Sequence, residues 1–185
     1  MSAIHARDIQ APPGPAIMIP GIAPDGSLYP IEKLAAHRAG RLHVAISAFV
    51  FSDGELLIQR RADGKYHCAG QWANTCCTHP HWGETVESAA VRRLSEELGF
   101  TLPLRKARTV EYRAVVGDGL IEHERVQMFV GKADRARLKI APDPSEVSET
   151  RWASPQDLRR EMDERPEVFT PWFRIYLDQF PDLVL

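Results

Sequence analysis

The segment from Glu84 to Leu98 constrains the fold of this chain more than any other. Its apolar residues recur every four positions, the spacing of an amphipathic helix, and Gly99 follows where a helix typically ends. A helix with one apolar face is stable when that face packs against another element. The segment therefore predicts a helix that covers part of a larger core. The recurring apolar residues are Val86, Ala90, Leu94 and Leu98.

Strand-like segments flank this helix on both sides. Residues 43–51 and 55–61 predict one hairpin, and residues 107–116 and 120–131 predict another, each with a short turn that contains glycine. After the second hairpin, two Ser/Thr-Pro pairs are typical of helix starts. This order of elements predicts an α+β domain with a mixed sheet.

The first 20 residues differ in composition from the rest of the chain. They contain four prolines and predict an extended N-terminal tail without chemistry of its own. Residues 21–185 predict a single domain, because a total length of 185 residues is ordinary for one domain.

The composition excludes several classes of protein. Hydrophobic residues make up 44% of the chain and the formal net charge is −2, so the basic excess typical of nucleic-acid-binding proteins is missing. No apolar run approaches the ~20 residues of a membrane span, and the N-terminus lacks an apolar segment of the signal-peptide type. We therefore expect a cytoplasmic protein without nucleic-acid or membrane partners. The sequence leaves the oligomeric state open.

Two of the three cysteines are neighbours, Cys76 and Cys77. An odd number of cysteines argues against a disulfide framework, and adjacent cysteines bridge only with strained geometry. We expect both to be reduced. If the segment is extended, Cys77 and His79 share one face and Cys76 points the other way, towards the core.

The residues THPHWGETVESAAVRRLSEELGF (78–100) resemble the Nudix box, a helix that holds a divalent metal against a diphosphate. Taken alone, the pairs Arg92/Glu96 and Arg93/Glu97 could equally be surface ion pairs, worth about 0.2–0.5 kcal/mol each. Two positions depart from the box: Thr78 replaces its first glycine, and Arg93 replaces the glutamate that binds metal in Nudix hydrolases. The second departure argues against diphosphate hydrolysis.

Five flanking segments point to one branch of this superfamily. In order they are IEKLAAHRAGRLH, QRRADGK, WANTCCTHP, YRAVVGDGLIEHE and FTPWF. Together they resemble the type 1 isopentenyl-diphosphate isomerases, which have the Nudix fold but isomerise their substrate. The resemblance implies a Nudix-like mixed β-sheet sandwiched by helices. It also implies isomerisation of isopentenyl diphosphate to dimethylallyl diphosphate through a tertiary carbocation.

A metal site is the first consequence of this resemblance. Glu122 and Glu124 are two apart on a predicted strand and therefore point to the same face. The resemblance adds His37, His43 and His79, giving a set suited to Mn²⁺, Zn²⁺ or Mg²⁺. Each histidine taken alone could be a core or surface residue, and the spacing between His37 and His43 is about one residue shorter than the family pattern. The remaining candidates are expected to be structural or solvent-facing: His67, His81 and His123.

A diphosphate needs cations, and the resemblance implies Lys33, Arg61 and Lys65, to which Arg93 could add. It further implies that Glu97 binds a Mg²⁺ ion that bridges to the diphosphate. From its helical position we expect the Glu97 side chain to face the surface and to contribute little to packing.

The resemblance also implies the residues of the reaction. Moving a double bond by a 1,3-proton shift needs an acid on one face of the substrate and a base on the other. The implied acid–base pair is Cys77 and Glu124, on opposite faces of the substrate. Tyr112 is expected near the acid, and Trp172 offers a π face to the carbocation. Trp172 could also be a core anchor of the last helix.

Two other functions stay open on sequence alone. One is a Nudix pyrophosphohydrolase acting on a nucleoside diphosphate derivative, and the other is a metal-stabilised binding module without catalysis. All three interpretations have a small-molecule diphosphate or a metal ion as the partner. Release of phosphate or pyrophosphate separates the hydrolase from the isomerase, and turnover of isopentenyl diphosphate excludes the binding module.

Overall fold

The computed structural model describes residues 16–180. Four α-helices, a 3₁₀ turn and nine strands lie within this range. In chain order they are β1 (Met18–Ile22), β2 (Leu28–Glu32), α1 (Lys33–Ala39), β3 (His43–Ser52), β4 (Glu55–Arg61), β5 (Trp72–Ala73), β6 (Cys76–Thr78), α2 (Val86–Leu98), β7 (Leu104–Gly117), β8 (Leu120–Lys132), β9 (Val147–Ala153), α3 (Pro155–Glu164), η1 (Pro166–Val168) and α4 (Pro171–Gln179).

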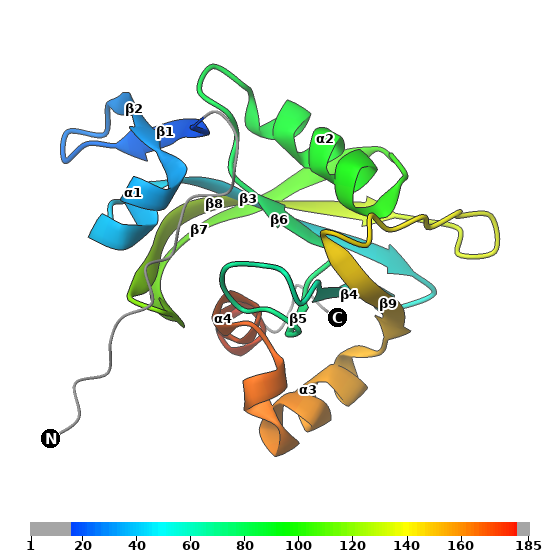
Figure 1. Ribbon diagram of the computed structural model, residues 1–185. Helices are drawn as coiled ribbons and strands as arrows, with labels where there is room; N and C mark the ends of the chain where they lie inside the picture. Colours follow the sequence, from blue (N-terminus) through cyan, green and yellow to red (C-terminus); the bar gives the residue numbers. More distant parts are fainter. Residues whose placement is uncertain (1–15, 181–185) are drawn as a thin grey trace, which may run out of the picture.

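The nine strands form one mixed sheet with β3 at its centre (Figure 1). β3 pairs in parallel with β8 and antiparallel with β4 and β6. In the parallel pair, His43 lies opposite Glu124. β8 also forms a long antiparallel hairpin with β7, in which Glu124 lies opposite Tyr112. The sheet register therefore brings three predicted site residues to the same place.

Helices cover both faces of the sheet, as predicted (Figure 1). Alternate residues of β3 point to opposite faces. On one side Ala48 and Val50 join a core cluster with Leu94 of α2, and on the other side Phe49 joins a larger cluster with Phe173 of α4. This confirms the α+β architecture of a mixed sheet sandwiched by helices.

The predicted central helix is present as α2, and both of its ends have a local cause. The Thr85 side chain accepts a hydrogen bond from the backbone N–H of Ser88 and caps the N-terminus. At the other end Gly99 has a positive φ of 74°. A Cβ at Gly99 would lie 2.6 Å from the carbonyl oxygen of Ala141, so glycine is needed both for the turn and for this close approach.

The predicted boundary of the N-terminal tail, at residue 20, needs correction. Residues 1–15 lie outside the described range, but β1 already begins at Met18. Pro20 lies opposite Pro30 of β2. Two facing prolines can form only a non-hydrogen-bonded pair, so the antiparallel ladder accommodates both. The apolar residues of the segment MIPGI indicate a strand here, even though the segment contains a proline.

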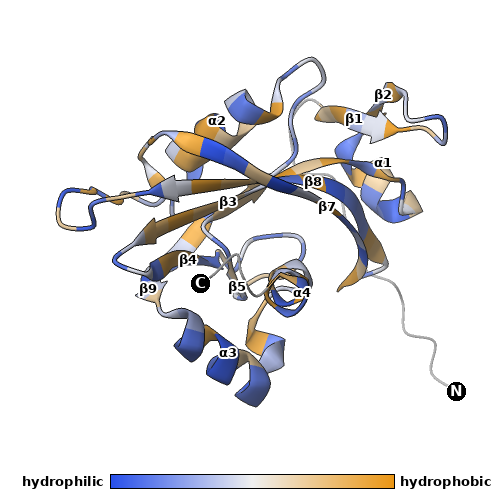
Figure 2. Cartoon of the chain, turned by 180° about the vertical axis from the view of Figure 1, so that it is seen from behind, coloured by the Kyte–Doolittle hydropathy of each residue, from blue (hydrophilic) through white to orange (hydrophobic). Residues whose placement is uncertain are grey.

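Hydropathy follows the layers of the fold. In Figure 2 hydrophobic and hydrophilic stretches alternate along the strands, whereas α3 is largely hydrophilic and Leu158 is its buried residue. Among residues 16–180 there is no helix with the length and apolar character needed to cross a membrane.

Candidate active site

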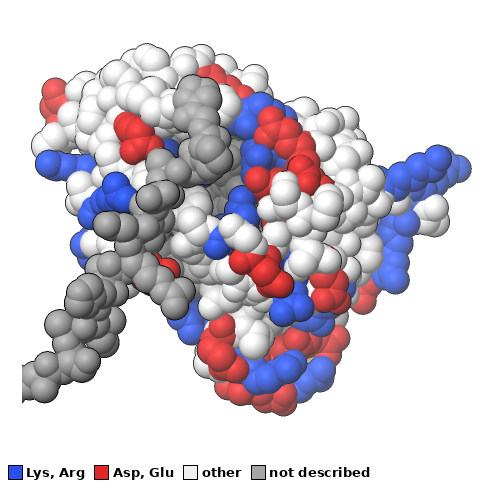
Figure 3. Space-filling model, in the orientation of Figure 1, with Lys and Arg blue, Asp and Glu red and all other residues white. Residues whose placement is uncertain are grey.

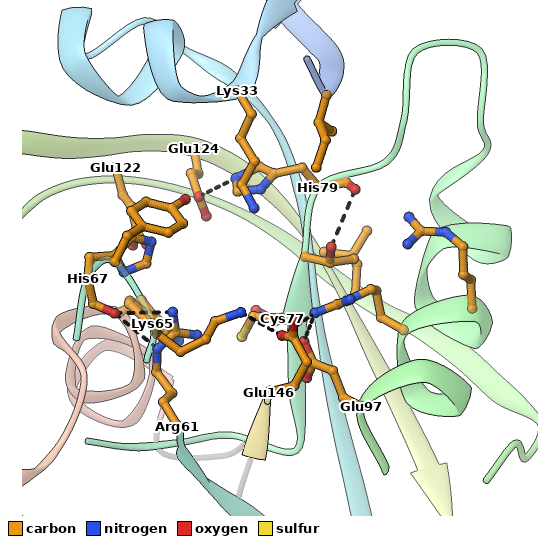
Figure 4. Close-up of a pocket in the computed structure, with 18 of the residues that line it drawn as sticks. Lys33, Arg61, Lys65, His67, Cys77, His79, Glu97, Glu122, Glu124 and Glu146 are labelled. Carbon is orange, nitrogen blue, oxygen red and sulfur yellow. Dashed lines mark hydrogen bonds and ion pairs between the residues drawn. The ribbon is translucent and has the colours of Figure 1, made fainter. Parts of the chain in front are cut away.

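A cavity of about 560 Å³ lies between the sheet, α2 and α4. In Figure 3, basic and acidic side chains lie next to one another around this hollow, and Figure 4 shows the residues that converge in it. The predicted site residues that line it are Lys33, Arg61, Lys65, Cys77, His79, Arg93, Glu97, Tyr112, Glu122, Glu124 and Trp172. His37 and His43 are fully buried, with ring centroids 5.1 and 4.8 Å from that of His79.

Three imidazoles and a carboxylate converge at one end of the cavity. The Nε2 atoms of His43 and His79 are 3.1 Å apart. Oε1 of Glu124 lies 2.8 Å from Nε2 of His79 and 3.5 Å from Nε2 of His43. With His37, these residues offer ligand atoms that all lie within 4.8 Å of one another. Such convergence of neutral nitrogen and carboxylate oxygen atoms is typical of a metal site.

Backbone carbonyls fix which nitrogen carries the proton in two of the three rings, those of His37 and His43. Nδ1 of His37 lies 2.7 Å from the carbonyl oxygen of Lys33, and Nδ1 of His43 lies 2.7 Å from that of Arg41. Both Nδ1 atoms therefore donate, which leaves the Nε2 lone pairs directed at the cluster. Burial lowers the pKa of His37 to about 4 and lowers the pKa of His79 well below its usual range. Neutral rings are the form that binds a metal.

The two carboxylates of β8 share a tyrosine. The Tyr112 hydroxyl lies 2.8 Å from Oε2 of Glu122 and 2.8 Å from Oε2 of Glu124. Burial, together with the charge of Glu124, raises the pKa of Glu122 well above its usual range. The hydrogen bonds that Tyr112 makes to described residues go to these carboxylates, because its position opposite Glu124 in the β7–β8 hairpin aims it there. That Tyr112 lies near the acid stays a prediction.

The two adjacent cysteines do face opposite sides. Cys76 is fully buried in the cluster beneath α2, whereas Cys77 lines the cavity. The Cys77 thiol donates to Oδ1 of Asn74 at 3.0 Å and lies 3.3 Å from the hydroxyl of Ser47. Burial raises the pKa of Cys77 to about 12. The thiol therefore keeps its proton at neutral pH, as a general acid must.

Cationic side chains also line the cavity. Lys33 lies near His79, whereas Lys65 lies at the opposite end, called the cation end (Figure 4). Burial lowers the pKa of Lys33 to about 8, and the charges of Lys65, Arg93 and Arg61 add to the effect. One oxygen, Oε2 of Glu146, lies 2.6 Å from Nζ of Lys65 and 2.8 Å from a guanidinium nitrogen of Arg93. Two of the four predicted diphosphate-binding cations are therefore already paired with one shared carboxylate.

Glu97 does not face the surface, which corrects our expectation for this residue. Only 4% of it is exposed. One carboxylate oxygen accepts a hydrogen bond of 2.9 Å from Nε2 of Gln59, and the other is paired with Arg93. Helical periodicity placed Glu97 beside the polar residues of α2, but β4 and the turn at Glu146 cover this part of the helix.

Sequence comparison identifies the family. A protein of Cereibacter sphaeroides named isopentenyl-diphosphate Delta-isomerase is 61% identical over 154 residues, which cover 83% of this chain and 86% of the relative. This chain belongs to the isopentenyl-diphosphate Delta-isomerase family. A relative of the same name from Dinoroseobacter shibae is 52% identical over 162 residues, or 86% of this chain and 91% of that protein. The family model described as NUDIX domain matches residues 41–173.

Solved structures agree with this isomerase family's Nudix fold. A crystal structure from Deinococcus radiodurans has a TM-score of 0.66 at 17% identity and covers 83% of this chain and 92% of that chain. The MutT protein from Methanosarcina mazei Go1 has a TM-score of 0.61 at 19% identity, over 76% of this chain and 94% of that chain. At such identities the likeness concerns the fold alone.

Several residues of the isomerase cavity were missed by sequence reasoning. His67 was expected to be structural or solvent-facing, yet it is buried and lines the cavity. Glu146 and Ser47 also line it, and Asn74 bonds the thiol. Their positions depend on loop conformation and on contacts between distant segments, which spacing does not report. By contrast, His81 is exposed at the edge of the cavity and His123 is half-buried, with Nδ1 3.2 Å from the carbonyl oxygen of Gly40.

Proposed function

We propose that this protein converts isopentenyl diphosphate to dimethylallyl diphosphate by protonation and deprotonation of the carbon skeleton. One observation carries the proposal: a protonated thiol, Cys77, and a carboxylate, Glu124, line the same cavity. Several cationic side chains line it as well. A hydrolase would need a metal-bound nucleophilic water and a metal-binding carboxylate at the position that Arg93 occupies. The acid and base found here serve a proton shift.

The residues present fit a divalent ion at the histidine end. Nε2 of His37 is buried without a hydrogen-bond partner among the described residues, and the Nε2 atoms of His43 and His79 crowd around one carboxylate oxygen. We propose that His37, His43, His79, Glu122 and Glu124 hold Mn²⁺, Zn²⁺ or Mg²⁺. When bound, such an ion supplies positive charge that keeps Glu124 ionised and fixes its orientation.

A second ion fits the other end. We propose that Glu97 binds Mg²⁺ together with the diphosphate, and that Lys33, Arg61 and Lys65 neutralise the remaining charge. Arg93, which is paired with Glu97, also contacts Glu96 and Glu146. Arg93 would therefore still have two carboxylate partners if Glu97 held Mg²⁺.

The residues then divide the proton shift between them. The Cys77 thiol gives its proton to the terminal CH₂ of the alkene, which leaves a tertiary cation at the branched carbon. Glu124 takes a proton from the neighbouring CH₂, and the new double bond forms there. Trp172 is 3% exposed in α4, with the Arg61 guanidinium 5.4 Å from its ring centroid. Its π system stabilises the cation by up to about 2 kcal/mol. In the reverse reaction the two residues exchange roles.

Proton NMR of isopentenyl diphosphate incubated with the protein and Mg²⁺ tests this function. The expected result is loss of the two vinylidene protons and growth of two methyl signals, with deuterium entering the product in D₂O. Release of phosphate or pyrophosphate would instead make the protein a hydrolase. An unchanged substrate spectrum would favour a binding module. Cytoplasmic location, and the absence of nucleic-acid and membrane partners, stay predictions.

A further inference from the structure

His67 is a buried residue of the cavity that neither the predicted metal set nor the proton shift uses. It lies in the loop between β4 and β5 and is 8% exposed. Its Nε2 atom faces Oε1 of Glu122 at 4.0 Å, and its Nδ1 atom has no hydrogen-bond partner among the described residues. Figure 4 shows the ring beside Glu122, on the side of the cavity away from His79. This position allows the imidazole to act on Glu122, a predicted metal ligand.

The ring of His67 is held firmly in place. It packs edge-on against Tyr66, with ring centroids 4.5 Å apart, and edge-on against Trp172 at 6.0 Å. It is stacked on His37 at 6.1 Å. Nε2 is the ring nitrogen that faces a carboxylate oxygen, whereas Nδ1 has no partner among the described residues, so the geometry favours a proton on Nε2.

Glu122 is the predicted ligand that most needs such a partner. His37, His43, His79 and Glu124 form one compact group of donors, whereas Glu122 groups with His37 and His67 instead. Tyr112 contacts Oε2 of Glu122 at 2.8 Å, and Oε1 is the oxygen that faces His67. Metal-binding carboxylates are usually oriented by hydrogen bonds from an outer layer of residues. The separation of 4.0 Å exceeds a hydrogen bond by only about 1 Å, within reach of a side-chain rotation.

We propose that His67 is a positioning residue of the metal centre, which donates Nε2–H to Oε1 of Glu122 and thereby holds this carboxylate as a ligand. The inference rests on the metal site of the proposed function. His67 links that site to the rest of the cavity, because its ring contacts Trp172 and its backbone carbonyl accepts hydrogen bonds of 3.4 and 3.2 Å from Arg61. The His67 side chain therefore faces a proposed metal ligand, and its backbone carbonyl hydrogen-bonds Arg61, a proposed diphosphate-binding residue.

Two substitutions separate these functions. His67→Phe keeps an aromatic ring against Tyr66 and Trp172, and keeps the carbonyl that binds Arg61, but it has no donor. His67→Gln keeps an N–H donor of similar reach. We expect His67→Phe to weaken binding of Mn²⁺ or Co²⁺ by about 10- to 100-fold, with the KM for isopentenyl diphosphate nearly unchanged. We expect His67→Gln to recover most of the affinity. The exposed residue His81 provides the control, His81→Phe, which should bind metal as the unaltered protein does.

Metal affinity is measured on full-length protein by competition with a chromophoric chelator, without substrate, so the readout is independent of turnover. The absorption bands of bound Co²⁺ should be retained in His67→Gln. Equal affinity in His67→Phe and the unaltered protein would overturn the proposal, as would equal loss in both variants. Altered cobalt bands in both variants would also overturn it, by making His67 a direct ligand. Isomerase activity of the unaltered protein, measured separately by NMR, tests the proposed function itself.

Discussion

The two ends of the cavity are built on different electrostatic principles. At the histidine end, the ligand residues are buried, and backbone carbonyls hold the rings of His37 and His43 in place. At the cation end, charged side chains already pair with one another: Glu146 contacts Lys65 and Arg93, and Arg93 also contacts Glu97. In the proposed function, the first end is preorganised for an ion that stays bound. The second end would exchange part of its internal ion pairs for the diphosphate and Mg²⁺ at each turnover. The Cys77 thiol lies in the cavity between these two sets.

Removing the thiol should produce the largest effect, since it disables the proton shift and leaves both ends intact. Cys77→Ala should lower kcat by at least about 10²–10⁴-fold, while Cys77→Ser retains a trace because a hydroxyl is a much weaker acid. NMR turnover assays and thermal melting measure this. The matched control is Cys76→Ala, which should reduce stability modestly and leave the rate nearly unchanged. A labelling experiment with an epoxide diphosphate should modify Cys77, and modification of Cys76 would reverse the face assignment.

Chelation should separate the two ends by how tightly each holds its ion. Brief treatment with EDTA should remove at least about 99% of the activity by taking the Mg²⁺ of the Glu97 site, and added Mg²⁺ should restore it. After the same treatment, elemental analysis should find about one ion retained per chain in the buried histidine site. His43→Ala, which removes a buried ligand, should retain none. Full activity in protein free of all divalent metal would contradict both sites.

The pH dependence should be dominated by Lys33, the cation beside the histidine end. Because the pKa of Lys33 is lowered to about 8, kcat/KM for isopentenyl diphosphate should fall up to tenfold per pH unit above that value as the free enzyme loses a positive charge. The same shift has the opposite effect on stability. The folded protein disfavours charged Lys33, so its contribution to the free energy of unfolding rises from pH about 8 to the ordinary pKa of 10.5.

Lys33→Arg tests this assignment, since a guanidinium stays charged throughout the range. The falling limb of the kcat/KM profile should move to higher pH in this variant. A limb that stays near pH 8 would assign the titration to another group.

Glu97→Gln should show whether the carboxylate belongs to the core as well as to the Mg²⁺ site. Because Glu97 is buried against Gln59 and Arg93, the substitution should cost about 1–3 kcal/mol of unfolding free energy, a fall in Tm of roughly 2–10 °C. It should also raise the Mg²⁺ concentration needed for half-maximal rate. Glu96→Gln removes an exposed partner of the same arginine and should change neither quantity appreciably. An unchanged Tm for Glu97→Gln would show that the Glu97 carboxylate contributes little to the free energy of unfolding, as first expected.

The smallest effect is expected at Glu146. Glu146→Gln removes the carboxylate that competes with the diphosphate for Lys65 and Arg93, so KM should fall about two- to fivefold, consistent with a part-buried ion pair worth about 0.5–1 kcal/mol. Glu149→Gln is the control, because Glu149 pairs with Arg60 in an exposed position at 4.0 Å. A rise in KM for Glu146→Gln would show that the carboxylate orders the cations rather than competing for them.

The difference between the two ends also explains what could be predicted from sequence. α2 and both hairpins follow from local periodicity and turn residues, and residue type identified His43, His79 and Glu124 once the family pattern was seen. In the structure these residues converge, which agrees with the predicted metal site. The partners at the cation end could not be found in this way. Glu146 reaches Arg93 from a turn 53 positions away, and the burial of Glu97 depends on β4 packing across it.

His67 illustrates a further limit. A histidine in a loop between two strands has no periodicity to assign it a face, so its burial against Glu122 and Trp172 depends on how the loop folds back over the cavity. Similarly, the start of β1 at Met18 is determined by pairing with β2, which a proline-rich stretch of sequence obscures.

The parallel pairing of β3 with β8 has a consequence for how the chain folds. His43 and Glu124 lie opposite one another in that pair but far apart along the chain, and a slip of one residue would turn Glu124 to the other face of the sheet. Closing such a long loop costs entropy before the contacts that reward it are made, so this pairing is intrinsically slow. An ion that needs both residues cannot bind tightly until the strands are in register. An ion held by the proposed site would therefore bind late, and its binding energy would favour the in-register alignment over alignments shifted by one residue.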